Sequence, residues 1–454
     1  MMKTTPPNVV WIFLDQCRTD VLGCYGHDFI QTPNIDRLAR AGVLFENAFC
    51  QNPVCVPSRS SILSGQYAHQ NGVFDNSGAL RAEDEHLLHT FGQAGYHTAN
   101  VGKIHVGLSA QEMGFQEHRP IEHDGIPHFH VPDNYPAAWP WRTFDAPGYP
   151  QPIIYATDLC PRERTYCAVG VSEAIDIFQQ HSFADAPLFL RLSLDRPHTP
   201  VSSPKPYDTM YAAQTTLPEF PNEERTAQIP TLRNYIHDRR WDQFTDEEIL
   251  HSRAYYYGLV THLDAELGRL LDLIESSPQR ENTIVVLAAD HGCMLGEHGL
   301  YVKCPHYYTE TARVPLIIAW PGQLPAGERR AALVEMVDLL PTLCELSGLP
   351  TPAQAVGHSL VPLLQGDAGG RDAVFAEQYA PDNPLRWAAV RTQQYVYTHY
   401  PNSGDELLFD LQADPQEQVN LLCRHSEPSA SARVVADALH QQIQVWLHDE
   451  ADSK

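Results

Sequence analysis

The stretch that decides the fold of this chain spans residues 55–65 and reads CVPSRSSILSG. Pro57 and the run after it predict a short helix with Cys55 at its N-terminus. The free N–H groups and the dipole at such an end attract anions, and Arg59 adds a fork of donors for a tetrahedral oxyanion. A helix N-terminus beside a cation also lowers the pKa of a cysteine. The stretch therefore predicts an activated thiol in an anion site, against the ordinary alternative of a buried structural thiol.

The composition describes a large globular protein. The chain has 454 residues, 43% hydrophobic and 19% charged, which is enough for a large core and two domains. Its formal net charge of -25 disfavours a nucleic-acid partner or an anionic membrane, because phosphate groups select basic surfaces. An anionic substrate would therefore have to be attracted by cations close to the site.

Two features bear on the cellular compartment. Residues 1–7 lack the cleavage pattern of a signal peptide, and the apolar run at 8–14 is too short to span a membrane. The ten cysteines lack the close repeated pairing of a zinc site, so we expect most of them to be reduced core thiols, and only Cys55 has a chemical role. These features predict a cytoplasmic protein without a membrane partner, or a periplasmic or secreted one if a leader was removed.

Short apolar runs alternate with amphipathic segments, the pattern of a layered α/β sheet. Strands are expected at residues 9–14, 43–45, 188–194, 283–289 and 315–319, and helices at 32–38 and 247–275. The three later strands are typical of buried central strands whose C-terminal ends carry a site.

Two segments rich in proline have no sustained period, at about 118–161 and 202–230. Long irregular segments often form pocket walls, so we expect substrate recognition there. A domain boundary is expected near residues 366–370, which divides the chain into 1–365 and 366–454. The smaller part should hold a small antiparallel sheet and a terminal helix at about 431–448.

Two pairs of polar residues follow expected strands. The first strand ends in Asp15-Gln16, and the strand at 283–289 is followed by Asp290-His291. Carboxylate and amide oxygens are ligands for a hard divalent cation, and an imidazole can join them. Either pair alone often caps a turn. Two such pairs flanking the stretch at Cys55 predict a metal site.

The chain resembles a known family over nearly its whole length. The order Cys-x-Pro-Ser-Arg looks like the signature of the type I, formylglycine-dependent sulfatases of the alkaline-phosphatase-like superfamily. Further similar motifs follow in the family's order: GKIHVG at 102–107, RPHTP at 196–200, DHG at 290–292, GEHGLYVK at 296–303, RVPLI at 313–317 and DPQEQVNL at 414–421. The resemblance implies an α/β fold with a large mixed central sheet between helices and a smaller C-terminal α+β subdomain. It also implies a sulfuric ester hydrolase with its catalytic domain at residues 1–365.

The resemblance also implies a modified nucleophile. Cys55 would be oxidised to formylglycine by a formylglycine-generating enzyme, and the hydrated aldehyde would attack the sulfate ester. One divalent metal ion would be held by five positions: Asp15, Gln16, Cys55, Asp290 and His291.

Five further residues receive roles from the resemblance. Arg59 and Lys103 would hold the hydrate and the sulfate oxygens. His105 would act on the hydrate. His198 and Lys303 would face the ester oxygen, where one of them protonates the departing alcohol.

Two departures from the family's pattern concern the metal. Many sulfatases carry a second carboxylate where this chain has Gln16, and an asparagine where it has His291. Calcium remains the first candidate, and the softer site also admits manganese, magnesium or zinc. The same donors resemble the phosphonate monoester and phosphodiester hydrolases of the superfamily, an alternative function. Those hydrolases usually carry glycine at the position of Ser58, so Ser58 favours sulfate esters.

The sequence leaves the alcohol half of the substrate open. A small-molecule or a saccharide sulfate ester is expected, and a homo-oligomer is compatible with the sequence. A third hypothesis is that the chain is a non-catalytic binding protein with an unmodified Cys55. Candidate substrate contacts are His128, His130, Trp139, Trp141, Arg142 and His306.

Overall fold

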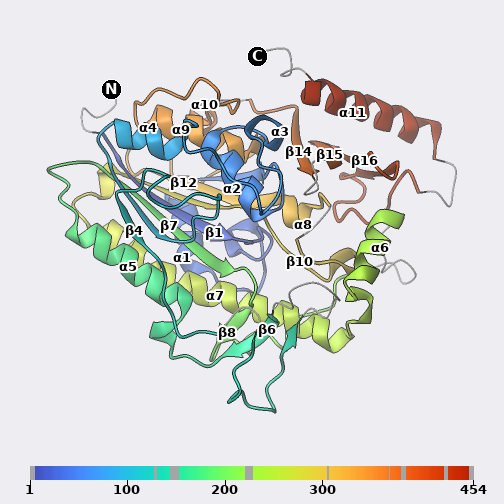
Figure 1. The fold of residues 1–454 in the computed structure, drawn as a ribbon, viewed down its shortest axis with the longest axis horizontal. Helices are drawn as coiled ribbons and strands as arrows, with labels where there is room; N and C mark the ends of the chain where they lie inside the picture. The colour runs from blue at the N-terminus through green and yellow to red at the C-terminus, as the bar shows by residue number, and fades with distance from the viewer. Residues whose placement is uncertain are drawn as a thin grey trace.

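A large mixed sheet forms the centre of the molecule (Figure 1). The computed structural model describes residues 6–126, 130–143, 153–219, 229–303, 306–367, 369–379, 385–423 and 428–448. The sheet has eight strands in the order β13-β2-β12-β9-β1-β7-β3-β4. Their bounds are β1 Asn8–Asp15, β2 Val43–Phe49, β3 His97–Gly102, β4 Glu117–Arg119, β7 Leu188–Pro197, β9 Thr283–Ala289, β12 Arg313–Ala319 and β13 Glu328–Glu335.

The direction of the strands decides where polar side chains can meet. β1 runs parallel to both β7 and β9, and β3 runs parallel to β7. The C-terminal ends of β9, β1, β7 and β3 therefore share one edge of the sheet. β12 runs antiparallel to both β9 and β2. The expectation that the strand at 315–319 carries the site at its C-terminal end is wrong, because Ala319 lies beside Val285, away from that edge.

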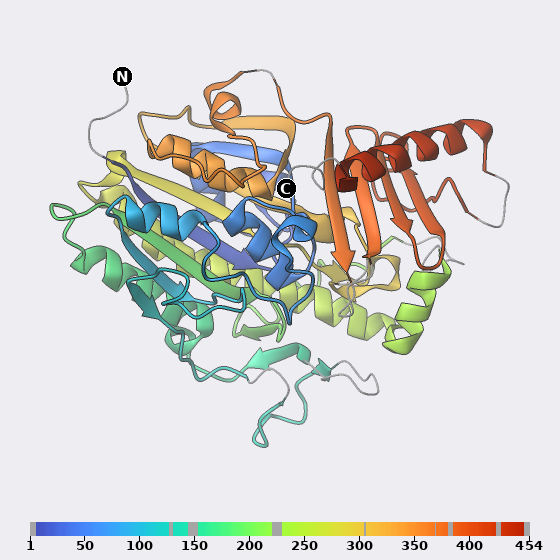
Figure 2. The ribbon, with the colours of Figure 1, turned by 45° about the horizontal axis from the view of Figure 1, so that its top comes forward.

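Helices cover both faces of the sheet, as Figure 2 shows. On one face α1, α5 and α7 pack against one another and against the strands, and on the other face α2, α4 and α9 pack together. The helix bounds are α1 Pro33–Ala41, α2 Cys55–Ser64, α3 Ala68–Asn71, α4 Leu87–Gln93, α5 Tyr166–Gln180, α6 Pro230–Asp238, α7 Asp246–Ser276, α8 Thr309–Ala312, α9 Leu339–Leu346 and α10 Val361–Gln365. No helix of the described ranges is both long and apolar enough to cross a membrane.

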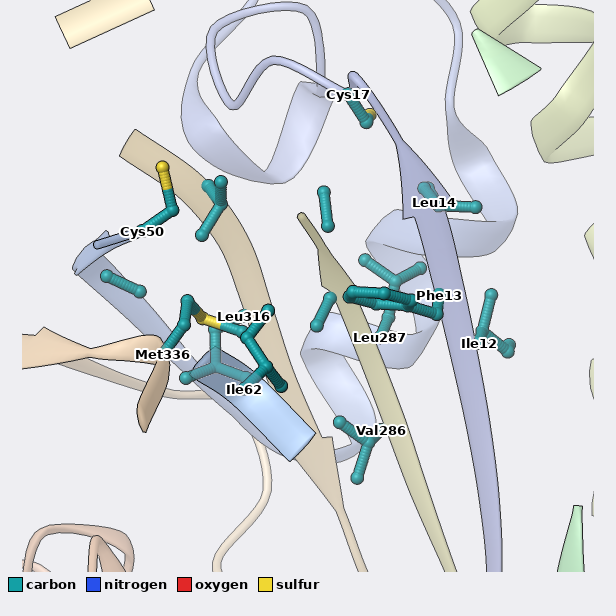
Figure 3. Close-up of a cluster of buried hydrophobic side chains, with 14 of the residues drawn as sticks. Ile12, Phe13, Leu14, Cys17, Cys50, Ile62, Val286, Leu287, Leu316 and Met336 are labelled. Atoms are coloured by element: carbon teal, nitrogen blue, oxygen red, sulfur yellow. The ribbon is translucent and has the colours of Figure 1, made fainter. Parts of the chain in front are cut away.

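The apolar core fixes α2 on the sheet. Every residue of β1 and β9 is buried, as expected for strands covered on both faces. Figure 3 shows Ile62 of α2 beside Leu316 of β12 and Met336, with Phe13 and Leu287 nearby. Because these side chains are fully buried, the helix cannot shift without opening the core. The N-terminus of α2 is thereby held at the edge where the parallel strands end.

A separate small sheet follows near the C-terminus. Four antiparallel strands form it, namely β14 Ala373–Tyr379, β15 Leu385–Thr392, β16 Tyr395–Tyr400 and β17 Asp405–Asp410. The helix α11 (Ala430–His448) covers it through a second core that includes Tyr397, Leu408 and Leu439. The predicted fold class, with its C-terminal α+β subdomain, is confirmed. The division at residue 365 stays a prediction.

The two proline-rich segments meet in space. Within them β6 (Ile153–Asp158) pairs with β5 (Arg142–Thr143) on one side and with β8 (Ser202–Pro204) on the other. A two-stranded ribbon, β10 (Met294–Leu295) and β11 (Tyr301–Val302), lies between β9 and β12 in the chain. These strands are only two to six residues long, so the local sequence shows no sustained period.

Candidate active site

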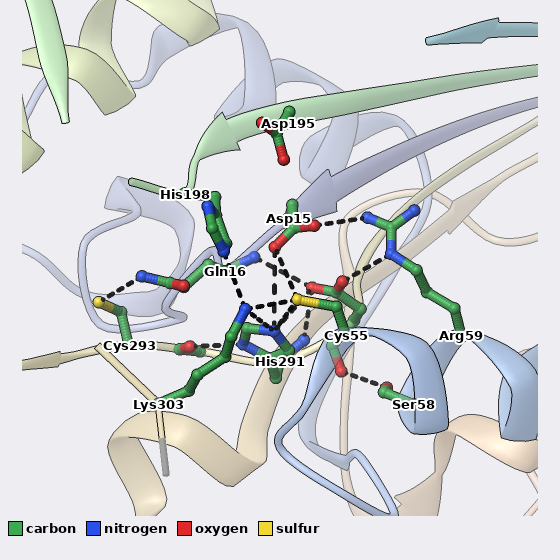
Figure 4. Close-up of polar contacts among 12 residues, drawn as sticks. Asp15, Gln16, Cys55, Ser58, Arg59, Asp195, His198, His291, Cys293 and Lys303 are labelled. Carbon is green, nitrogen blue, oxygen red and sulfur yellow. Dashed lines mark hydrogen bonds and ion pairs between the residues drawn. The ribbon is translucent and has the colours of Figure 1, made fainter. Parts of the chain in front are cut away.

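The predicted site residues gather where β1, β7 and β9 end (Figure 4). Asp15 is the last residue of β1, and Gln16 follows it with a left-handed φ of 66°. Asp290 and His291 follow β9, and α2 begins with Cys55. Three segments that are far apart in the sequence thus meet in one place.

Cys55 lies at the centre of this group and is fully buried. Its Sγ lies 3.2 Å from His291 Nε2 and 3.7 Å from Asp15 Oδ1, and it accepts a hydrogen bond from Lys303 Nζ. Burial and Asp15 raise the pKa of the thiol, but Lys303, Lys103 and His291 outweigh them and leave it well below the usual value. The position therefore favours a negatively charged atom, as the helix N-terminus predicts.

Two buried carboxylates share one arginine. Arg59 donates from Nη2 to Asp15 Oδ2 at 3.0 Å and from Nε to Asp290 Oδ2 at 2.8 Å, and all three side chains are fully buried. Its Nη1 donates to Ser193 Oγ at 3.0 Å. Burial favours the neutral form of Asp15, but Lys103 and other cations hold its pKa well below the usual value. Arg59 thus holds the carboxylates, and its predicted contact with sulfate oxygens stays a prediction.

The donor set fits a divalent cation. Ligand atoms of Asp15, Cys55, Asp290 and His291 all lie within 4.8 Å of one another. The Gln16 amide donates from Nε2 to Cys293 Sγ at 3.0 Å, while its Oε1 is buried with no hydrogen-bond partner among the described residues. A buried oxygen without a partner is costly unless a cation or a donor meets it.

The orientation of His291 agrees with a metal site. Its Nδ1 lies 2.8 Å from the carbonyl oxygen of Gly292, which can only accept, so Nδ1 carries the proton. Nε2 then faces Cys55 at 3.2 Å, and its deprotonated form could bind a cation there. The oxygen Oδ1 of Asp290 accepts from the backbone N–H of Gln16 at 3.0 Å and of His291 at 2.9 Å. These hydrogen bonds orient the ligands in the way that outer contacts do in metal sites.

Lys303 and His198 lie on the side of Cys55 away from Arg59 (Figure 4). Lys303 Nζ lies 2.8 Å from His198 Nε2, and His198 Nδ1 lies 2.6 Å from the carbonyl oxygen of Thr199. Burial lowers the pKa of Lys303, but Cys55 and Asp15 outweigh it and raise the pKa. The structure therefore brings together the two residues that the resemblance places at the ester oxygen.

Lys103 bridges two carboxylates. Its Nζ lies 2.7 Å from Asp15 Oδ2 and 2.8 Å from Asp195 Oδ1. Burial favours the neutral amine, but both carboxylates outweigh it and raise the pKa of Lys103. Asp195 was missed in the sequence, although it follows the expected strand at 188–194 and directly precedes the RPHTP segment. Cys293, the partner of Gln16, was missed too, and no local pattern marks it.

The other predicted residues have surroundings of different kinds. His105 is half-buried with a left-handed φ of 54°, and its Nδ1 has no hydrogen-bond partner in the described ranges. Among the candidate substrate contacts, Trp139 packs on Lys205, Arg142 pairs with Glu248 at 3.0 Å, and His306 is fully buried. Burial lowers the pKa of His306 to about 3, which keeps this imidazole neutral. Two more of these candidates are exposed, His130 and Trp141. His128 lies outside the described residues.

Comparison with known proteins decides the family. The sequence model of the sulfatases matches residues 7–349, and a model described as the C-terminal part of N-sulphoglucosamine sulphohydrolase matches residues 296–447. The chain belongs to the sulfatase family. Its predicted family is thereby confirmed, and the chain is a hydrolytic enzyme of the class that cleaves sulfate esters.

This sulfatase is similar to other sulfatases in sequence and to a phosphonate monoester hydrolase in fold. It is 30% identical to an arylsulfatase of Clostridium perfringens, over 92% of this chain and 90% of the relative. It is 27% identical to an N-acetylglucosamine-6-O-sulfatase of Bacteroides thetaiotaomicron, over 100% and 89% of the two chains. Among solved structures it is similar to a phosphonate monoester hydrolase of Agrobacterium radiobacter, with a TM-score of 0.80, 25% identity and coverage of 98% and 96%.

Proposed function

We propose that this sulfatase hydrolyses a sulfate monoester with a formylglycine, made from Cys55, as its nucleophile. The observation that carries the proposal is the position of Cys55 Sγ, at a helix N-terminus and in contact with both Lys303 and His291. Conversion of the thiol to an aldehyde supplies, as its hydrate, two hydroxyl groups at the same place. The maturation requires a formylglycine-generating enzyme as a partner.

The metal ligands in this proposal are Asp15, Gln16, Asp290 and His291, with position 55 completing the set. The orphaned Oε1 of Gln16 and the position of His291 Nε2, which faces Cys55, support this choice. A divalent cation bound there would supply Lewis-acid charge that offsets the negative charge at position 55 and on the ester oxygens. Calcium is our first candidate, and the imidazole ligand keeps manganese, magnesium and zinc as alternatives.

The chain's own cations support the reaction around position 55. Lys303 contacts position 55 itself, and Lys103 contacts the neighbouring Asp15. Both ammonium groups would balance negative charge on the sulfate oxygens. Lys303 and His198 share a 2.8 Å contact, and we assign His198 the protonation of the departing alcohol. His105 is assigned to the hydrate, and Arg59 to the alignment of the two carboxylates as well as the oxyanion.

The substrate class follows from the relatives. One of them is named for a sulfated N-acetylglucosamine and another for aryl sulfates. We propose a saccharide or small-molecule sulfate ester, bound by walls that come from the proline-rich segments. Residues 1–365 form the catalytic domain and 366–454 the C-terminal subdomain in this proposal, and association into a homo-oligomer remains a prediction.

One alternative function has a specific observation in its favour. Gln16 and His291 stand where many sulfatases carry a second carboxylate and an asparagine, and the fold is similar to that of a phosphonate monoester hydrolase. The chain would then cleave phosphonate monoesters or phosphodiesters.

One experiment separates these functions. The purified enzyme is assayed with a sulfate monoester, a phosphonate monoester and a phosphodiester that share one nitrophenol leaving group. The mass of the peptide that contains Cys55 is measured on the same sample, where conversion to formylglycine removes roughly 18 Da. We expect a converted peptide and the highest kcat/KM for the sulfate. A converted enzyme that prefers the phosphonate would support the alternative, and an unconverted active enzyme would contradict formylglycine.

A further inference from the structure

Asp195 is the carboxylate of the site that stays open to solvent. It lies near the C-terminal end of β7, and its side chain is 26% exposed, whereas that of Asp15 is fully buried. Both carboxylates contact the same ammonium, Lys103 Nζ, at 2.8 and 2.7 Å. Figure 4 shows Asp195 above Asp15, on the same side as His198. Asp195 therefore keeps a solvent-exposed side next to the reacting groups.

The position of Asp195 is close to the reacting groups. Ligand atoms of Asp15, Asp195 and His198 lie within 4.8 Å of one another. His198 is in turn 2.8 Å from Lys303. The nearest other cation, Arg196, is 3.9 Å from the second oxygen of Asp195. A unit of negative charge thus sits beside the groups that are assigned to the ester.

A count of charges shows what this carboxylate changes. Three cations surround position 55, and without Asp195 two carboxylates would oppose them. With it, three carboxylates face these three cations, apart from any metal ion and from Arg196, which lies 3.9 Å from Asp195 at the edge of the group. The cations are Arg59, Lys103 and Lys303, and the carboxylates are Asp15, Asp290 and Asp195. Asp195 therefore removes one unit of positive charge from the open side of the site.

Substrates of this superfamily differ in charge. A sulfate monoester carries one negative charge, whereas a phosphate monoester carries close to two above its second pKa of about 6. We propose that Asp195 is a specificity-determining residue that selects esters with one negative charge over dianionic phosphate monoesters. This inference rests on the proposed function, because it concerns the same site. The carboxylate repels the extra charge of a phosphate monoester. At a separation of roughly 7 Å and an effective dielectric constant of about 20 to 40, this repulsion changes the ratio of kcat/KM for the two esters by roughly 10-fold or more.

The test compares two substrates that share a leaving group. Nitrophenyl sulfate and nitrophenyl phosphate are assayed at pH 8 with the converted wild-type enzyme and with Asp195→Asn, Asp195→Ser and Asp195→Glu. Asp272→Asn is the matched control, because Asp272 near the C-terminal end of α7 is 66% exposed and pairs with Arg37 of α1. Circular dichroism checks the fold of each variant, and Asp195→Ser replaces Asp195→Asn if the latter does not fold.

We expect the ratio of kcat/KM for phosphate over sulfate to rise by roughly 10-fold or more in Asp195→Asn. Asp195→Glu and Asp272→Asn should keep the wild-type ratio. An equal fall in both activities, with the ratio within about two-fold of wild type, would overturn the inference and leave Asp195 as a support for Lys103. A converted wild-type enzyme without activity on sulfate esters would count against the proposed function instead, while the ratio on phosphate and phosphodiester substrates would still test Asp195.

Discussion

The two halves of the candidate site are held in different ways. The metal half consists of Asp15, Gln16, Asp290 and His291, which are fully buried and follow two neighbouring parallel strands. The open half consists of Lys103, Asp195, His198 and Lys303, whose positions depend on ion pairs and hydrogen bonds between distant segments. Strand order places the metal half, and Arg59 holds its two carboxylates, so it should tolerate little change. The open half should be where substrate preference is set.

Cys55 joins the two halves, so its loss gives the largest expected effect. We predict that Cys55→Ala lowers kcat by at least about 10⁴-fold, because the nucleophile is removed. The variant should fold as the wild type does, since α2 is anchored by Ile62 and its neighbours. Activity and thermal unfolding are measured beside Cys344→Ala, a buried cysteine of α9 that should leave kcat unchanged. More than trace activity in a folded Cys55→Ala would contradict the assignment.

The metal half can be tested by removing the cation. We predict that a chelator stops catalysis and that Asp290→Asn weakens metal binding by 10- to 100-fold or more. Asp290→Asn also leaves Arg59 with one buried carboxylate instead of two, so thermal stability should fall as well. Elemental analysis and titration with calcium and manganese give the stoichiometry and affinity. An active enzyme that contains no divalent metal would refute the site.

The open half can be tested through the leaving group. We predict that His198→Ala slows hydrolysis of alkyl or sugar sulfates by roughly 10²- to 10⁴-fold. An activated nitrophenyl sulfate should lose much less, because its departing oxygen needs no proton. Steady-state kinetics on both substrates provide the measurement. If both rates fall by the same factor, His198 holds the sulfate or the fold, and Lys303 becomes the candidate proton donor.

The smallest effect concerns the support that α7 gives to the metal half. Tyr256 donates a hydrogen bond to the carbonyl oxygen of Gln16 at 2.6 Å, whereas the adjacent Tyr255 contacts Thr157 at 2.9 Å. We predict that Tyr256→Phe and Tyr255→Phe each lower the free energy of unfolding by about 1 kcal/mol. Only Tyr256→Phe should also weaken metal affinity, by less than about 10-fold. An equal metal affinity in the two variants would show that α7 does not position Gln16.

Much of the fold follows from local patterns. The strand expected at 283–289 has those bounds in β9, and the helices expected at 247–275 and 431–448 are one residue shorter at one or both ends than α7 and α11. Buried strands and long amphipathic helices can be recognised from the spacing of their apolar residues. The strand β3 (His97–Gly102) and the helix α5 were not expected, although the buried side chains of α5 recur at helical spacing.

The sequence by itself determined which chemical groups the site contains. The residues at the ends of β1 and β9, the cysteine before a helix and the family motifs are all local, so short stretches of chain specify them. The tertiary structure alone decided the direction of β12 and the partners of each charge. Lys103 and Asp195 lie 92 residues apart in the chain yet share an ion pair, and the fully buried Arg59 donates to two carboxylates. Such pairings depend on which strands become neighbours, and burial then selects the partners that leave the fewest charges without compensation.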